Sequence, residues 1–269
     1  TVLLGSMMLQ SKTEDGGANS VIYYDAKGLT WSVFAGLAVG TAEMLSFIVS
    51  GMGVQATQFI PIIIGGSVMF GAVLGVLMLG ENMMLHGWFG IAMLVSGIAM
   101  VATDPGDKVE EGGGGDHSEP PPLSAWIAPA LLCAAAYAFY NIFIKKGSAS
   151  INPILGCVVL QFVAAIFGSL LLGGIVLFVD GGDTSQLEYD NTGLFWAILA
   201  GLAVGTAELL SFVVSGMGVN ATQSIPVIIG GSVMFGAVLG LLILGETMML
   251  QGWCAFLVFM PVICVVASA

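Results

Sequence analysis

The run GGSVMFGAVLG stands at residues 65–75 and again at residues 230–240. Outward from this run, residues 28–88 align with residues 193–253 without a gap, and 48 of the 61 aligned positions are identical. A match of this length and identity excludes chance, so one unit of the chain was duplicated and has diverged little. The fold must therefore contain the same group of elements twice.

The composition places this duplicated chain in a membrane. Of its 269 residues 57% are hydrophobic and only 8% are charged, with a mean hydropathy of +1.01, whereas soluble globular chains carry about 25% charged residues. Its five basic residues are all lysines and stand against 17 acidic ones. This balance argues against a nucleic-acid partner, because a phosphate backbone needs cationic side chains. The four cysteines lie in apolar runs without metal-ligand spacing, which is typical of packing residues.

Apolar runs long enough to cross a bilayer, which takes about 20 residues, predict eight transmembrane helices. They lie at residues 29–52, 57–80, 85–102, 123–144, 153–179, 194–216, 221–243 and 250–268. In the second copy two spans precede the three repeated ones, so the unit has five spans and begins near residue 123. By the same offset the first unit would begin about 43 residues before Thr1. We expect an all-α membrane protein with eight complete spans of a total of ten.

The odd number of spans in each unit sets the relative orientation of the two copies. The second copy must enter the membrane upside down, which predicts inverted repeats. The first repeat covers residues 1–103 and lacks its first helix and most of its second, of which residues 1–9 would be the end. An acidic linker rich in Gly and Pro follows at residues 104–122, and the second repeat covers residues 123–269.

The lysines orient this topology. Lys12, Lys27, Lys145 and Lys146 fall in loops on one side of the predicted spans, and Lys108 alone falls on the other. By the positive-inside rule the first side is cytoplasmic. We therefore expect a multi-pass integral membrane protein with both termini in the cytoplasm, in a plasma or an organelle membrane.

Two glutamates at equivalent positions of the repeat are the main candidates for function. Glu43 and Glu208 stand in GLAVGTAEMLSF and GLAVGTAELLSF, each near the middle of its span. An ionisable side chain at that depth costs at least about 2.5 kcal/mol, so it should face the bundle interior or a water-filled cavity. The functional interpretation is a proton or cation relay, or a group that binds a polar substrate. The structural alternative is a protonated glutamate that bridges two helices through nearby hydroxyls, namely Ser46, Ser211, Thr41 or Thr206.

Polar residues and a proline open the next span of each copy. Pro61 and Pro226 stand near the start of these spans, where a proline frees a backbone carbonyl and favours a kink. The polar residues beside them are predicted to line a substrate vestibule or to satisfy the helix N-terminus. They are Thr57 and Gln58 in the first copy and Thr222, Gln223 and Ser224 in the second.

Aromatic and amide side chains mark the span that begins near residue 123 and the one that follows. Tyr137, Tyr140 and Asn141 share one helix face because they follow an i, i+3, i+4 spacing, and Gln161 lies on the next span. They either line a cavity or form an aromatic belt at the membrane interface near Lys145. No hydrolytic motif, metal-binding motif or phosphate-binding loop is present in the sequence, so we expect no enzyme, no cofactor and no metal site.

Three stretches resemble a known family. The sequences GAVLGVLMLGENMMLHGWFGIAMLVSGIAMVAT (residues 71–103) and GAVLGLLILGETMMLQGWCAFL (residues 236–257) look like the LGE-containing junction of the fourth and fifth helices of EamA-type carriers. The sequence YAFYNIFIKKGSASINPILGCVVLQFVAAIFG (residues 137–168) is similar to the opening helix pair of an EamA domain. The chain is therefore identified as resembling the drug/metabolite transporter superfamily.

That resemblance implies a carrier of ten helices with a central cavity that opens alternately to either side. Glu81 and Glu246 would then sit at helix ends on opposite membrane faces, where they stabilise helix junctions or gates together with Pro61 and Pro226. The third and fourth helices of each half would line the cavity. In this chain those helices hold Glu43, Thr57, Gln58, Glu208, Thr222 and Gln223.

The leading hypothesis is a secondary transporter of a small neutral or cationic metabolite or drug that works by alternating access, with coupling to protons through the two glutamates. Phosphorylated substrates are disfavoured because no lysine lies inside a predicted span. The alternatives are a cation channel or divalent-metal permease, and a membrane scaffold that transports nothing. Carboxyls sealed in side-chain contacts would favour the scaffold. The expected partners are a small-molecule substrate, the lipid bilayer and protons, and a homodimer is left open.

Overall fold

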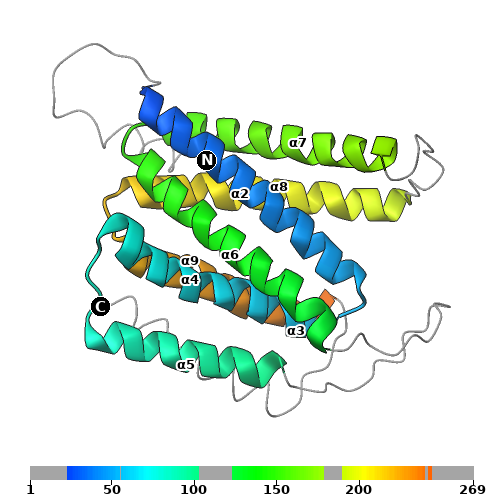
Figure 1. Ribbon diagram of the computed structural model, residues 1–269, viewed down its shortest axis with the longest axis horizontal. Coiled ribbons are helices and arrows are strands. Elements are labelled where there is room, and N and C mark those ends of the chain that lie inside the picture. The colour runs from blue at the N-terminus through cyan, green and yellow to red at the C-terminus, as the bar shows by residue number, and fades with distance from the viewer. Residues whose placement is uncertain (1–22, 55, 103–122, 179–189, 240–241, 244–269) are drawn as a thin grey trace.

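A computed structural model describes residues 23–54, 56–102, 123–178, 190–239 and 242–243. This part of the chain is helical apart from its turns and one isolated bridge between Tyr24 and Ile151. The elements in chain order are α2 (Ala26–Gly51), α3 (Ala56–Ile60), the π-helix η1 (Pro61–Gly65), α4 (Gly66–Leu74), the π-helix η2 (Gly75–Leu79), α5 (Leu85–Ala102), α6 (Leu123–Ser148), α7 (Pro153–Phe178), α8 (Asn191–Gly216) and α9 (Ala221–Leu239) (Figure 1).

Within the described residues five helical segments are long and apolar enough to cross a membrane. They are Ala26–Gly51, Gln58–Leu79, Ala125–Ser148, Pro153–Phe178 and Asn191–Gly216. Each coincides with one of the predicted spans. The helices α5 and α9 coincide with two further predicted spans, but they are not among these five segments. The remaining predicted span, at residues 250–268, lies outside the described residues, as do residues 1–9, the linker and most of the loop after α7.

The predicted span at residues 57–80 is not one regular helix. It begins as α3, widens into η1 at Pro61, returns to α4 and widens again into η2. A proline cannot donate its nitrogen to the carbonyl four residues before it, so the helix at this point departs from the α-helical hydrogen-bond pattern. The expected kink at Pro61 takes the form of a π-helical segment. In the second copy Pro226 lies within the continuous helix α9.

The helix α2 packs against both α6 and α7 (Figure 1). Close approach of the backbones depends on glycine. A Cβ atom on Gly28 would lie 2.7 Å from the carbonyl oxygen of Ser150, and one on Gly36 would lie 2.6 Å from the carbonyl oxygen of Leu160. Both distances are too short for a real side chain. These glycines therefore form a helix-packing face of α2.

The helix directions follow from these contacts. The start of α2 lies at the start of α7, and Gly40 lies further along against Ala164, so α2 and α7 run in the same direction. In contrast, Gly156 near the start of α7 faces Phe212 near the end of α8. The helices α7 and α8 are therefore antiparallel. It follows that α2 and α8, which are equivalent in the repeat, run in opposite directions.

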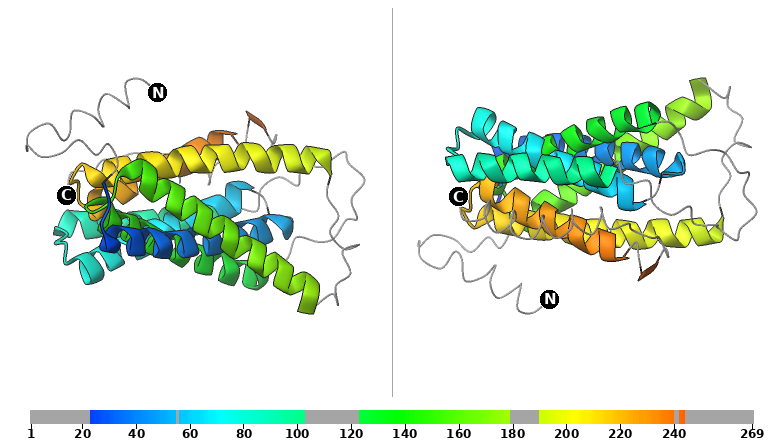
Figure 2. Two further views of the ribbon diagram at one scale, coloured as in Figure 1. Left: turned by 90° about the horizontal axis from the view of Figure 1, so that it is seen from above. Right: turned by 90° about the horizontal axis from the view of Figure 1, so that it is seen from below.

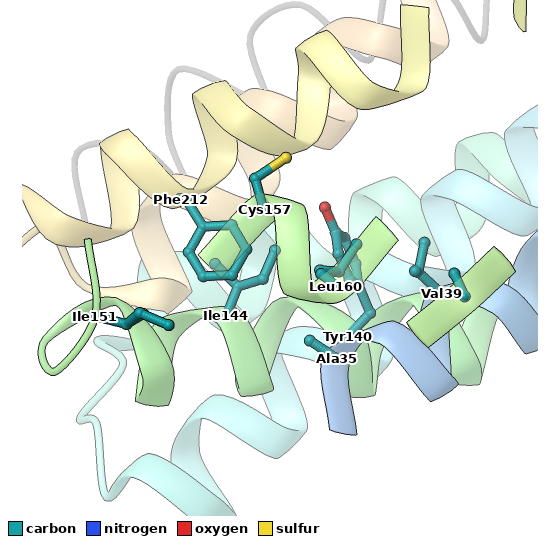
Figure 3. Close-up of a cluster of buried hydrophobic side chains, with 9 residues drawn as sticks. Ala35, Val39, Tyr140, Ile144, Ile151, Cys157, Leu160 and Phe212 are labelled. Atoms are coloured by element: carbon teal, nitrogen blue, oxygen red, sulfur yellow. The ribbon is translucent and has the colours of Figure 1, made fainter. Parts of the chain in front are cut away.

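Two clusters of buried side chains make up much of the core that the structure describes. One joins α2 and α6 to α7 and α8, and Figure 3 shows Phe212 of α8 lying against Ile144 and Cys157 within it. The other joins α2 and α6 to α3 and η1 and includes Phe59, Trp126 and Cys133. The buried thiol of Cys133 donates to the carbonyl oxygen of Ala42 at 3.0 Å, as expected for a packing residue.

One end of the bundle carries the described lysines, and we call it the lysine end. Lys27 begins α2 beside Asp25, whose side chain accepts a hydrogen bond from the backbone of Gly28 at 3.1 Å. Lys145 and Lys146 end α6 at the same place, because the nitrogen of Asp25 donates to Ser150 at 2.9 Å just after that helix. Figure 2 shows α7 and α8 close together at this end and apart at the other. The side of a membrane that this end would face stays a prediction.

Candidate functional site

Glu208 is a carboxyl buried between helices. It lies on α8 with 3% of its surface exposed, and its Oε2 atom accepts a hydrogen bond from Nε2 of Gln161 on α7. Its Oε1 atom is buried and has no hydrogen-bond partner among the described residues. A buried acceptor without a partner is costly. The Oε1 atom can therefore accept a proton, a hydrogen bond from a polar ligand or the charge of a cation.

Glu43 is the second carboxyl of the site. It lies on α2, is half-buried, and interacts electrostatically with Glu208 and with Tyr137. Its surroundings differ from those of its repeat partner, because α2 is enclosed by α6 and α7 whereas much of α8 is exposed. The structure thus brings the two equivalent glutamates into one electrostatic group and gives them different environments.

The tyrosines of α6 lie next to these carboxyls. The rings of Tyr137 and Tyr140 meet edge to face with centroids 6.3 Å apart. Tyr140 is 6% exposed, interacts electrostatically with Glu208, and shares a hydrogen bond with the side chain of Ser211 on α8. Of the two alternatives for these residues, burial of this degree favours a place inside the bundle over an aromatic belt at the membrane interface.

Asn141, predicted on the same face as the tyrosines, makes a local contact. Its Nδ2 atom donates to the backbone oxygen of Tyr137 at 2.7 Å within α6. Three of the four hydroxyls proposed as bridges to the glutamates donate within their own helix: Thr41 to Leu37, Thr206 to Leu202 and Ser211 to Ala207, each at 2.9 Å. The helix-to-helix partner of Glu208 is instead Gln161. A lone amide in the otherwise apolar span 153–179 was the signal for it.

The polar residues at the starts of α3 and α9 occupy a different place from the carboxyls. Thr222 and Ser224 are buried near the start of α9, where Thr222 packs against Gly75 of η2. Gln223 and Gln58 are half-buried, and the side chains of Thr57 and Pro226 are not among those described. The backbone nitrogen of Thr222 donates a hydrogen bond to the side chain of Glu81. This bond satisfies one of the free N–H groups at the N-terminus of α9.

Glu81 joins the two repeats. Its Oε1 and Oε2 atoms accept hydrogen bonds from the backbone nitrogens of Ala221 and Thr222, both at 2.8 Å. The residue before it, Gly80, has φ +68° and turns the chain at the end of η2. Pro61 is buried at the first position of η1. Glu246, the repeat partner of Glu81, lies outside the described residues.

Lys145, in the last turn of α6, contacts the end of α8. Its Nζ atom donates to the backbone oxygen of Ser215 at 3.1 Å and to that of Val219. These carbonyls belong to the end of α8 and to the turn that follows. No sequence pattern indicated this contact, because its partners lie 70 or more residues away along the chain.

The assembled site has carboxyl, amide and phenol groups from four helices. They are Glu43 of α2, Tyr137 and Tyr140 of α6, Gln161 of α7, and Glu208 and Ser211 of α8. In the part of the chain that the structure describes, no three His, Cys, Asp or Glu side chains come close enough to hold a metal ion. Two carboxylates fall short of the six or more oxygens that a hard divalent cation requires. The site is chemically suited to protons and to neutral or singly charged polar groups.

No protein-family model matches this chain, and no curated protein sequence matches it.

Proposed function

We propose that the protein is a secondary transporter that moves a small neutral or cationic metabolite or drug by alternating access, coupled to protons. The observation that carries the proposal is Glu208, a carboxyl with 3% exposure, one hydrogen bond to Gln161 and one acceptor atom that has no partner among the described residues. A group in this state can take up a proton or bind a ligand and release it again. The nearby Glu43 and Tyr137 supply a second acid and an aromatic ring.

The inverted repeat belongs to this proposal. Its support is the antiparallel direction of the equivalent helices α2 and α8, together with a second pair. Gly71 of α4 lies against Ile225 of α9, and Gly75 lies against Thr222, so α4 and α9 also run in opposite directions. Two halves that are inverted relative to each other can exchange conformations and thereby open a central site to either side in turn.

The wider topology follows from the same reasoning. We propose ten spans in two units of five, of which this sequence holds eight, with both termini in the cytoplasm together with the lysine end. The resemblance to EamA-type carriers of the drug/metabolite transporter superfamily points the same way. The described lysines Lys27, Lys145 and Lys146 gather at one end, which is the distribution that the positive-inside rule requires.

The non-transporting scaffold receives less support than the carrier. A scaffold would seal both glutamates in side-chain contacts, yet Glu43 is half-buried and, in the part of the chain that the structure describes, one oxygen of Glu208 has no hydrogen-bond partner. A divalent-metal permease is disfavoured by the small number of acidic groups at the site.

The test is transport by the purified full chain in liposomes that contain a pH-sensitive dye. Probes added outside are tetraphenylphosphonium, choline, putrescine and leucine, with glucose 6-phosphate as the anionic control. We expect at least one of the first four to dissipate an imposed pH gradient in a saturable way, and the sugar phosphate to have no effect. An ohmic ion current much faster than carrier turnover would identify a channel instead, and no flux with any probe would contradict the proposal.

A further inference from the structure

The turn between α8 and α9, residues 217–220, is held from both sides by charged side chains from other parts of the chain. Lys145 at the end of α6 donates to the backbone oxygens of Ser215 and Val219. Glu81, which follows η2 in the first repeat, accepts from the nitrogens of Ala221 and Thr222. Segments from three distant parts of the sequence therefore meet at the lysine end.

The charges match the helix ends that they contact. The last carbonyls of a helix carry partial negative charge and the first N–H groups carry partial positive charge, and neither set has partners within its own helix. Lys145 meets the carbonyl end of α8 and Glu81 meets the N–H end of α9. The two side chains also attract each other, since Glu81 interacts electrostatically with Lys145. Hydrogen bonds from charged groups are about twice as strong as neutral ones.

This contact fixes the part of α8 that covers the carboxyl site. Ser215 lies one turn after Phe212, and Phe212 lies one turn after Glu208 on the same helix. The ring of Phe212 is fully buried against α6 and α7, where Figure 3 shows it beside Ile144 and Cys157. As long as the end of α8 is held, this ring stands between Glu208 and the lysine end.

The opposite end of the same helix pair is not held in this way. In Figure 2 the light green α7 and the yellow α8 diverge away from the lysine end. A Cβ atom on Gly173 of α7 or on Gly193 of α8 would meet no described atom within 4 Å. The two helices thus contact each other at the end where Lys145 and Glu81 act.

We propose that Lys145 and Glu81 form a latch that closes the lysine end over Glu208, and that release of this latch is the step that opens the site to that side. The proposal rests on the proposed transport function, but the closed state that it describes can be measured without any substrate. Lys145 and Glu81 act here as positioning residues, because they hold the turn after α8 and do not touch the carboxyls.

Native cysteines report the state of the latch. Cys157 is buried where α7 meets α8, with its thiol 3.8 Å from the backbone oxygen of Gly205, and it should become accessible when the end of α8 moves away. Cys133 is buried between α2 and α6 and should not respond. The full chain in phosphatidylcholine nanodiscs is treated with a sulfonated maleimide, and modification of each cysteine is followed by peptide mass spectrometry.

The variants are Lys145→Met and Glu81→Gln, with two matched controls. Lys146→Met removes the neighbouring lysine, whose Nζ atom lies over the Trp31 ring at 4.7 Å and not on α8. Lys145→Arg keeps a charged donor. We expect Lys145→Met and Glu81→Gln each to speed the modification of Cys157 by about tenfold or more, since charged hydrogen bonds are lost, and both controls to match the unchanged protein.

The double variant, which combines Lys145→Met with Glu81→Gln, tests whether the two side chains act on the same turn. Because both side chains hold the same turn, we expect the combined rise to be smaller than the product of the single rises. An unchanged Cys157 rate in both single variants would overturn the proposal, and so would an equal rise in Lys146→Met. A parallel rise at Cys133 would also overturn it, because that outcome indicates general loosening of the bundle. None of these outcomes depends on transport, so failure of the latch and failure of the proposed function are distinguishable.

Discussion

Replacement of Glu208 by Gln will abolish uptake driven by a pH gradient, whereas the same replacement at Glu43 will slow it. Gln cannot gain or lose a proton, and at position 208 it stands in a buried place beside the amide of Gln161. A positioned proton-transfer group contributes about a hundredfold or more to a rate. Glu43 is half-buried and more open to its surroundings, so its loss removes one of two acids and leaves Glu208 in place.

The measurement is initial uptake, into liposomes with and without a pH gradient, of the probe that the transport screen identifies. Counterflow of labelled against unlabelled probe, which needs no proton step, serves as the control for folding and substrate binding. We expect the Glu208→Gln variant to retain counterflow and to lose the response to the gradient. Gradient-driven uptake that survives in both variants and in their combination would remove the proton role from this pair of carboxyls.

The composition and the apolar runs predicted the coarse features of the fold. The chain is helical where the structure describes it, and five of the predicted spans coincide with helical segments able to cross a membrane. The depth of Glu43 and Glu208 in their spans predicted that they face the interior. Each of these inferences depends only on local pattern and on the cost of burying charge in an apolar medium.

The features that the sequence did not predict depend on which helices become neighbours. The hydrogen bond from Gln161 to Glu208 joins residues 47 positions apart, and that from Lys145 to Ser215 joins residues 70 apart. Periodicity assigns a residue to a helix face but does not indicate which helix packs against that face. The two copies are similar in sequence but pack against different neighbours, so equivalent residues can differ in local structure. Pro61 lies in the π-helix η1, whereas Pro226 lies within the α-helix α9.

The equivalent glycines Gly36 and Gly201 should differ strongly in their response to the same substitution. A Cβ atom on Gly36 would lie 2.6 Å from the backbone oxygen of Leu160 and 2.8 Å from Cβ of Val163, so Gly36→Val must push α2 away from α7. Overpacking of this kind costs about 1–3 kcal/mol, and we expect the upper end because a backbone atom cannot rotate aside. A Cβ atom on Gly201 would meet no described atom within 4 Å. We expect Gly201→Val to change stability by no more than about 0.5 kcal/mol.

The two variants are compared by thermal unfolding of the 269-residue chain in detergent. Unfolding is followed by tryptophan fluorescence and by the fraction of protein that remains monomeric after heating. The segment GLAVGTAE is identical at residues 36–43 and 201–208, so helix propensity and sequence context are matched. Any difference in stability must therefore come from what faces the helix. Equal destabilisation would mean that a further helix covers the Gly201 face of α8 as α7 covers the Gly36 face of α2. That helix would then pack on α8 in the second repeat as α7 packs on α2 in the first.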